Sequence, residues 1–152
     1  MPKIRTARAM AALALGAFVV TSAGLIAPPA AAAEPACSTN YKWASGSYNN
    51  KKTFLWVPAY PAGSGYGTLC TVSPGASGVE VRMIQDALVK CYGRSITVDG
   101  EFGPATKTAL KYAQGVEDIG VDGYYGDKTR LNLKWPRRYS TNSVYTGTCM
   151  RM

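Results

Sequence analysis

A nine-residue pattern occurs twice in this chain and constrains its fold more than any other feature. The frame Val-Asp-Gly-x-aromatic-Gly-x-x-Thr is present at Val98–Thr106 and again at Val121–Thr129, 23 residues further on. In each copy Asp-Gly predicts a tight turn, because glycine reaches positive φ at little cost. The second glycine precedes a helix start, where Pro104 and Asp127 are well tolerated. The repeat therefore predicts two similar turn–helix units, each anchored in the core by its aromatic ring.

Apolar spacing and end signals predict three helices. The first is expected over residues 79–91, ending near Gly93, because apolar residues and a glutamine recur there at i, i+3, i+4, i+7 and i+11: Val81, Ile84, Gln85, Leu88 and Tyr92. The second is expected over residues 104–114, with three buried positions: Ala109, Leu110 and Ala113. The third is expected from residue 127 to 133 or 134, burying Leu131 or Leu133.

Residues 1–33 have the layout of a secretory signal. A basic start, an apolar run from about residue 9 to 27 and an alanine-rich segment ending at Ala33 follow one another. The alternative is an uncleaved membrane anchor, because the run approaches the roughly 20 apolar residues that a spanning helix needs. We expect cleavage after Ala33, which leaves a chain of 119 residues that is secreted and extracellular or associated with the cell wall.

The expected mature chain is basic. Without Lys3, Arg5 and Arg8 it keeps 14 basic and nine acidic side chains, a net charge of +5. Such a charge favours anionic partners, namely wall polymers, membrane surfaces or nucleic acid, and export argues against nucleic acid. The basic residues are also scattered, so an ordinary solvated surface explains them equally well.

Four cysteines, all in the mature part, predict two disulfides in a small exported chain. Three connectivities are possible, and we favour Cys37–Cys70 with Cys91–Cys149. The first closes the N-terminal segment on itself, and the second pins the C-terminal tail onto the central domain. Their spacing fits no zinc pattern, and the sequence has no histidine, so neither a metal nor a cofactor is expected.

The same composition argues against an enzyme. Without histidine, Ser-His-Asp and Cys-His arrangements are excluded, and oxidised cysteines provide no thiolate nucleophile. A carboxylate pair of the glycosidase kind remains, with Asp99, Glu101 and Asp122 as candidates. Both aspartates precede a glycine in a turn, however, where bonding to nearby backbone N–H groups is the ordinary role.

The segment from residue 34 to 75 differs in character. It is rich in glycine, serine, proline and aromatic residues, and Thr53–Val57 is its one clear strand-like run. Its rings either stack on sugars or cover the core of a small domain that has little aliphatic material: Tyr41, Trp43, Tyr48, Trp56, Tyr60 and Tyr66.

The helix before the first turn and the paired turns resemble the peptidoglycan-binding domain of the three-helix type. The resemblance rests on Val81-x-x-Ile84-Gln85-x-x-Leu88 and on both Asp-Gly-x-aromatic-Gly-x-x-Thr frames. It departs from the family at Ala113, where a large aromatic is usual, so Trp135, Tyr112 or the N-terminal segment must fill that volume. Asn132 replaces a small apolar residue and suggests a shortened last helix.

The resemblance implies a mainly α fold, a compact three-helix domain over residues 76–135. A disulfide-tied extension with a short strand or hairpin (34–75) precedes it, and a tail pinned by Cys149 (136–152) follows it. The implied function is that of a secreted, monomeric and non-catalytic module that binds peptidoglycan through glycan strand or stem peptide, with anionic wall polymers as further partners. A secreted protein–protein interaction or inhibitor module is the alternative, and a carboxylate-based wall hydrolase is a weaker one.

The two turns are expected to lie near one another, with a shallow ligand groove between them. Stem-peptide carboxylates suit the free N–H groups of helix starts, and aromatic rings can stack on sugars. The proposed surroundings of the groove are seven residues: Tyr92, Arg94, Asp99, Glu101, Asp122, Tyr124 and Tyr125. The alternative is that Tyr92 and Tyr125 are core rings and that the aspartates only stabilise turns.

Overall fold

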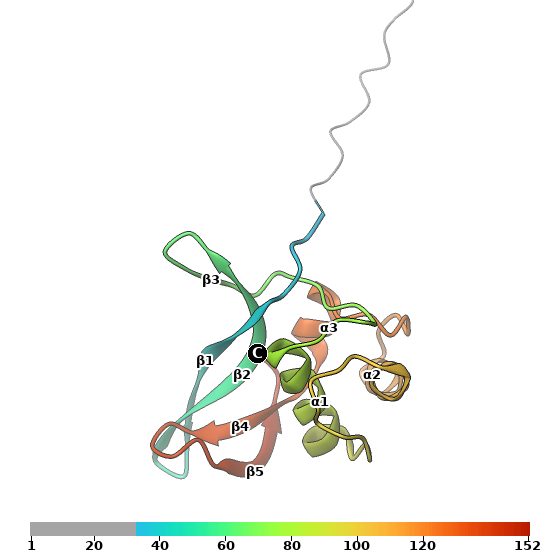
Figure 1. The fold of residues 1–152 in the computed structure, drawn as a ribbon. Coiled ribbons are helices and arrows are strands. Elements are labelled where there is room, and N and C mark those ends of the chain that lie inside the picture. The colour runs from blue at the N-terminus through green and yellow to red at the C-terminus, as the bar shows by residue number, and fades with distance from the viewer. Residues whose placement is uncertain (1–32) are drawn as a thin grey trace, which may run out of the picture. The chain divides into compact units, whose positions relative to one another are not determined.

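An antiparallel sheet packed against three helices makes up the part of the chain that the structure describes, residues 33–152 of a computed structural model (Figure 1). The strands are β1 (Thr39–Tyr48), β2 (Lys51–Ala62), β3 (Gly65–Gly67), β4 (Trp135–Tyr139) and β5 (Tyr145–Met150). The helices are α1 (Val79–Tyr92), α2 (Pro104–Val116) and α3 (Asp127–Asn132). The predicted signal, residues 1–33, lies outside the described residues except for its last position. In residues 33–152 no helix has the length and apolar character needed to cross a membrane.

The prediction of a mainly α, three-helix bundle is wrong, because the sheet is as large a part of the fold as the helices. The strand order is β1-β2-β4-β5, and β3 pairs with another part of β2. Thr53 of β2 lies opposite Tyr139 of β4, and Phe54 lies opposite Arg138. Residues more than 80 positions apart in the sequence therefore share one ladder, which no local pattern shows.

The N-terminal extension forms a long hairpin. Asn49 and Asn50, at its tip, have positive φ values of 50° and 59°. Positive φ at both central residues is the geometry of a two-residue hairpin turn, and asparagine tolerates it well. The strand expected at Thr53–Val57 is present, but it is longer than expected. It runs from Lys51 to Ala62 and includes Pro58 and Pro61.

The C-terminal segment is a second hairpin rather than a tail. β4 pairs with β5, with Trp135 opposite Met150 and Pro136 opposite Cys149. Both disulfides have the expected pairing, Cys37–Cys70 and Cys91–Cys149. The second one joins the end of α1 to β5, so the covalent link holds this hairpin beside the helices.

The helices follow the apolar spacing closely. α1 ends at Gly93, whose left-handed φ of 63° matches the expected stop. α2 runs two residues further than predicted, and α3 has only six residues, as Asn132 suggested. Leu133 is buried whereas Leu131 is exposed, which decides between the two predicted core positions.

The core lies between the sheet and the helices. Leu55 of β2, Ile84 of α1 and Leu110 of α2 are fully buried in it. Trp135 is the largest fully buried side chain and packs edge-on against Tyr125, with ring centroids 6.1 Å apart. Trp135 and Ala113 belong to the same core cluster, whereas Tyr112 is exposed.

Candidate functional site

The first Asp-Gly turn is held by a buried glutamine. The side-chain nitrogen of Gln85 donates to Asp99 Oδ1 at 2.8 Å, and it lies 3.0 Å from both Glu101 O and Thr106 Oγ1. The Gln85 Oε1 atom accepts the backbone N–H of Gly100 at 2.8 Å. One amide side chain on α1 thus fixes the turn and the first turn of α2 together.

The second turn has the same network. Gln114 on α2 donates to Asp122 Oδ1 at 2.8 Å, and it lies 3.0 Å from Tyr124 O and 3.1 Å from Thr129 Oγ1. Its Oε1 accepts the N–H of Gly123 at 2.8 Å. The repeat therefore includes a glutamine from the preceding helix, which the frame read from the sequence did not contain. The glutamine does not belong to the repeated frame because its separation from the aspartate along the sequence differs, 14 residues in the first copy and eight in the second.

Both turn aspartates are held in the ionised form. The backbone N–H of Glu101 and the amide of Gln85 hold the pKa of Asp99 below its usual range. For Asp122, burial acts to raise the pKa, but the N–H of Tyr124 and the amide of Gln114 outweigh it and lower the pKa. A general acid needs a raised pKa, so these carboxylates have the properties of turn stabilisers.

An extended segment joins the two turns. Val72 exchanges two backbone hydrogen bonds with Tyr125, of 2.9 and 3.0 Å. Four residues later, Ala76 O accepts the N–H of Phe102, the equivalent residue of the first repeat, at 2.9 Å. Both repeats therefore form backbone hydrogen bonds with the same segment, residues 72–76.

The structure does not bring all seven predicted groove residues together. Tyr92 lies in the interior, where its hydroxyl donates to Glu117 Oε1 at 2.8 Å and accepts the N–H of Lys134 at 2.7 Å. Tyr125 is completely buried against Trp135. The other five reach the surface, where they line three separate hollows instead of one groove.

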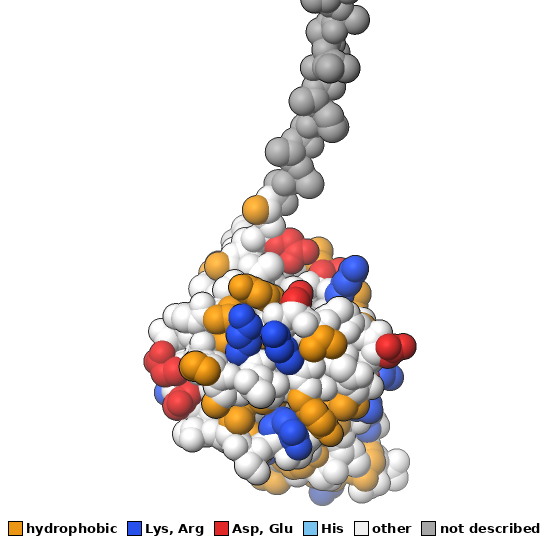
Figure 2. Space-filling view, turned by 90° about the vertical axis from the view of Figure 1, so that its right-hand side faces the viewer, with side chains coloured by type: hydrophobic (Ala, Val, Ile, Leu, Met, Phe, Trp, Pro, Cys, Tyr) orange, Lys and Arg blue, Asp and Glu red, His pale blue; other side chains and the backbone are white. Residues whose placement is uncertain are grey.

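Tyr124 lies at the most varied of these hollows. This hollow, of about 550 Å³, is lined by residues of the second Asp-Gly turn and by the start of α3. Tyr124 is 47% exposed, and Lys107 Nζ of α2 lies 5.1 Å from its ring centroid. Lys107 also lines another hollow, together with Pro74 and Gly103. Figure 2 views the side of the molecule on which α2 lies and shows basic side chains close together, with hydrophobic ones beside them.

The remaining predicted residues border two other hollows. Asp99 and Glu101 face the start of α1 across a hollow of about 320 Å³ that also contains Arg82. Arg94 lies at a hollow of about 680 Å³ along α2, with its guanidinium carbon 3.9 Å above the ring of Tyr112. No signal in the sequence paired Arg94 with Tyr112, because they lie on different elements.

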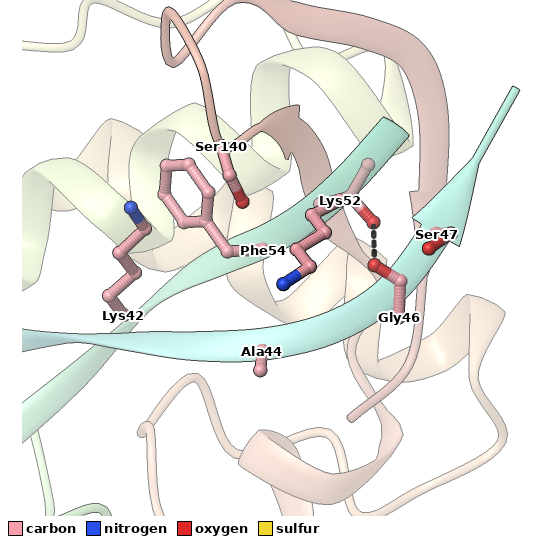
Figure 3. Close-up of a pocket in the computed structure, with 8 residues that line it drawn as sticks. Lys42, Ala44, Gly46, Ser47, Lys52, Phe54 and Ser140 are labelled. Atoms are coloured by element: carbon pink, nitrogen blue, oxygen red, sulfur yellow. Dashed lines mark hydrogen bonds between the residues drawn. The ribbon is translucent and has the colours of Figure 1, made fainter. Parts of the chain in front are cut away.

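A further hollow, of about 360 Å³, lies on the sheet and was not anticipated. Lys42, Lys52 and Phe54 line it together with Ser140 (Figure 3). Lys42 Nζ lies 4.2 Å from the centroid of the Phe54 ring and covers it, which explains why this phenylalanine on the outer face is buried. The local strand pattern does not reveal this hollow, because Ser140 reaches it only through the β2–β4 pairing.

Exposed rings lie on β1 and β3. Tyr41 and Trp43 of β1 have centroids 6.4 Å apart, and Tyr66 of β3 lies 5.9 Å from Tyr41. Between 37% and 57% of each side chain is exposed, so these three rings are surface rings. Trp56 and Tyr60 are instead half-buried. Within residues 33–152 no group of three or more histidine, cysteine, aspartate or glutamate side chains is arranged to hold a metal.

The duplicated turns, each secured by a buried glutamine, define a small module built of paired helix–turn repeats. Residues 77–131 match the family model described as "Putative peptidoglycan binding domain".

Two curated relatives are similar to the chain. It is 36% identical over 94 residues to the N-acetylmuramoyl-L-alanine amidase CwlL of Bacillus licheniformis, covering 58% of this chain and 24% of the amidase. It is 40% identical over 62 residues to the zinc D-Ala-D-Ala carboxypeptidase of Streptomyces albus G, covering 39% and 24%. The chain thus spans about a quarter of the length of each relative.

Two solved structures are also similar. A fused zinc-dependent amidase/peptidase/peptidoglycan-binding domain-containing protein from Clostridium acetobutylicum is 42% identical, with a TM-score of 0.37, over 39% of this chain and 26% of that one. The SleB N-terminal domain is 35% identical, with a TM-score of 0.39, over 41% of this chain and 85% of that one.

Proposed function

We propose that this chain is a secreted, non-catalytic module that binds the peptidoglycan of the bacterial cell wall. The observation that carries the proposal is the pair of identical glutamine–aspartate turns within the family match at residues 77–131. The turns provide a rigid base on which exposed side chains hold their positions, as a recognition surface requires.

The contact surface that we propose centres on Tyr124. Its exposed ring can stack on a sugar face, and the Lys107 ammonium beside it can pair with a stem-peptide carboxylate. Lys111, whose side chain packs beside Gly123, adds positive charge next to the same turn. Asp122 and Tyr125 act as positioning residues, and Tyr92 has an internal role only.

The helix starts contribute less than the sequence suggested. α2 begins with Pro104, which has no N–H to donate. Asp127 already places a carboxylate in the first turn of α3, where it also binds Arg130 at 2.5 Å. Anionic groups of the wall are therefore expected to meet lysine side chains rather than helix ends.

The proposal of a non-catalytic role rests on the chain's own chemistry. The sequence has no histidine, and hydrogen bonds lower the pKa values of Asp99 and Asp122. The activities named for the relatives belong to proteins of which this chain spans about a quarter. Clearing of a turbid cell-wall suspension by the pure protein would contradict a non-catalytic role.

Co-sedimentation with purified insoluble peptidoglycan at moderate salt tests the proposal. We expect the protein in the pellet, and Tyr124→Ala should weaken retention about tenfold, since stacking and burial of one ring contribute on the order of 1–3 kcal/mol. Tyr66→Ala, a matched exposed tyrosine on β3, should sediment like the wild type. Absence of wild-type protein from the pellet would refute wall binding, and equal retention of both variants would refute the Tyr124 surface.

Export can be tested separately. Mass spectrometry of the protein from culture supernatant should give a chain that begins at Glu34. Retention of the full-length chain in the membrane fraction would contradict cleavage and favour the anchor interpretation.

The exposed rings of β1 and β3 favour a second candidate function, binding of another secreted protein. Tyr41, Trp43 and Tyr66 form one aromatic cluster on the surface, and rings of this kind are enriched at protein interfaces. If Trp43→Ala abolishes capture of a secreted partner while wall sedimentation is absent, this second function replaces the first.

A further inference from the structure

Arg94 is a half-buried cation with no acidic partner among the described residues. Three other arginines on these elements are each paired with a carboxylate: Arg130 with Asp127, Arg138 with Asp86 and Arg151 with Glu117. No ion pair or hydrogen bond of Arg94's side chain is formed within residues 33–152, and its Nε atom is buried without a partner. Burying the Nε donor without a partner costs about 1–3 kcal/mol. The side chain as a whole is only half-buried, so a ligand's acceptor can reach the terminal N–H groups of the guanidinium.

The guanidinium of Arg94 lies over the ring of Tyr112. Its central carbon lies 3.9 Å from the centroid of that ring, which is closer than any other cation in the described chain comes to a ring. Attraction between the cation and the ring holds the guanidinium in place beside the hollow that both residues line. Its N–H groups suit a planar acceptor such as a carboxylate.

The hollow beside Arg94 is lined by small apolar groups. Ala105, Thr108 and Ala109 come from one face of α2, at spacings that return to the same side of the helix, and Ile96 comes from the facing loop. The hollow has a volume of about 680 Å³, the largest of those described here. The lining provides no second charge, and its apolar groups, with the hydroxyls of Ser95 and Thr108 beside them, suit small apolar side chains.

We propose that the Arg94–Tyr112 hollow binds the terminal carboxylate of a short peptide whose side chains are small and apolar. A single guanidinium with no second cation in the lining suits a planar monoanion better than a phosphate, whose further charge would find no counter-charge there. The proposal rests on the proposed function, because peptidoglycan stem peptides offer such carboxylates. It assigns the terminal carboxylate of the stem peptide to this hollow, while the glycan and the other carboxylates of the stem peptide meet the Tyr124 surface.

Titration with N-acetyl-Ala-Ala, monitored by NMR of the arginine side chains, tests the proposal directly. We expect the Arg94 Nε–H resonance to shift in a saturable way, while the C-terminally amidated dipeptide leaves it unchanged. An equal shift with acid and amide, or no shift with the acid, would overturn the proposal. Because both ligands are added to the wild-type protein, this comparison does not depend on how any variant folds.

Two arginine variants separate a specific site from general attraction. Arg94→Lys keeps the charge but loses the fork and the stacking, so it should weaken dipeptide binding about tenfold. Arg82 is an exposed arginine beside the first Asp-Gly turn, and Arg82→Lys should bind the dipeptide like the wild type. Equal weakening by both changes would show charge attraction only and would overturn the site.

Wall co-sedimentation of the same samples distinguishes failure of this site from failure of the proposed function. If the wild type sediments but the dipeptide does not shift Arg94, the peptide site is wrong and wall binding stands. If the wild type does not sediment, the proposed function fails and the peptide assignment fails with it.

Discussion

Gln114 is the side chain on which the second turn depends, so Gln114→Leu tests the turn network most directly. The side chain is 1% exposed, and leucine fills a similar volume. The change removes the acceptor of the Gly123 N–H, which is then buried without a partner at a cost of about 1–3 kcal/mol. It also removes the bonds to Tyr124 O and Thr129 Oγ1, each of which contributes about 1 kcal/mol.

The bond to Asp122 adds less, because that carboxylate is exposed and keeps the N–H of Tyr124. The apolar contacts of leucine offset part of the loss. The expected decrease in the free energy of unfolding is about 3 kcal/mol, a large share of the roughly 5–15 kcal/mol typical of a native domain.

Urea unfolding of the oxidised protein at pH 7, followed by far- and near-UV circular dichroism, measures this decrease. Gln85→Leu provides the matched control, because Gln85 makes the same bonds in the first turn. The two variants should agree within about 1 kcal/mol, with unchanged m-values. Thr129→Val, which removes only one hydroxyl, should cost about 1 kcal/mol. A loss below about 1 kcal/mol for either glutamine variant would refute the reasoning.

Other changes have equally definite outcomes. Tyr125→Phe should raise the free energy of unfolding by about 1 kcal/mol, because the buried Tyr125 hydroxyl has no hydrogen-bond partner among the described residues; a lower midpoint in thermal unfolding would contradict this. Replacing both Cys91 and Cys149 by serine should lower the free energy of unfolding by about 2–4 kcal/mol, since the unfolded chain gains conformational freedom over a separation of 58 residues; an unchanged urea midpoint would show that the disulfide contributes nothing. The folded-state pKa values of Asp99 and Asp122 are lowered, so their contribution is present above about pH 4 and is lost as the pH falls through the folded values. Asp122→Asn should therefore make stability depend less on pH below about pH 4 in urea titrations, and an equal dependence would contradict the assignment.

The side chains around the buried carboxylate of Glu117 show why Tyr92 could not be placed from the sequence. Burial acts to raise the pKa of Glu117, but the Tyr92 hydroxyl and Arg151 outweigh it and lower the pKa. Burial is also the main reason why the pKa of Tyr92 is raised. Arg151 comes from the end of the chain, so this cluster forms only once the C-terminal hairpin has folded against α1 and α2. Tyr92 looked equally suited to a groove or to the core until that packing was known.

The local elements were predictable because their causes are local. Apolar spacing determines α1, and the stops and starts at Gly93 and Pro104 follow from backbone conformations that neighbouring residues dictate. The small core of the paired turns also depends on residues close in sequence. For these reasons the helix bounds agree with the prediction to within about two residues.

The sheet was not predictable in the same way. β4 and β5 have ordinary polar and aromatic sequences. β4 becomes a strand because it pairs with Thr53 and Phe54 of β2, and β5 pairs in turn with β4. The miss had a physical cause, since strand pairing is decided by long-range contacts rather than by local preference. It turned a predicted tail into part of the core, with Trp135 at its centre.

The sequence by itself determined the duplicated turns, because Asp-Gly geometry and the helix starts after it follow from neighbouring residues. It also determined that the cysteines can form two disulfides and that no histidine is present, whereas their pairing was a preference that the structure confirmed. Only the tertiary structure decided that Gln85 and Gln114 secure those turns and that Arg94 stacks on Tyr112. The reason is that each of these contacts joins different elements, and their separation in space is set by how helices and sheet pack rather than by spacing along the chain.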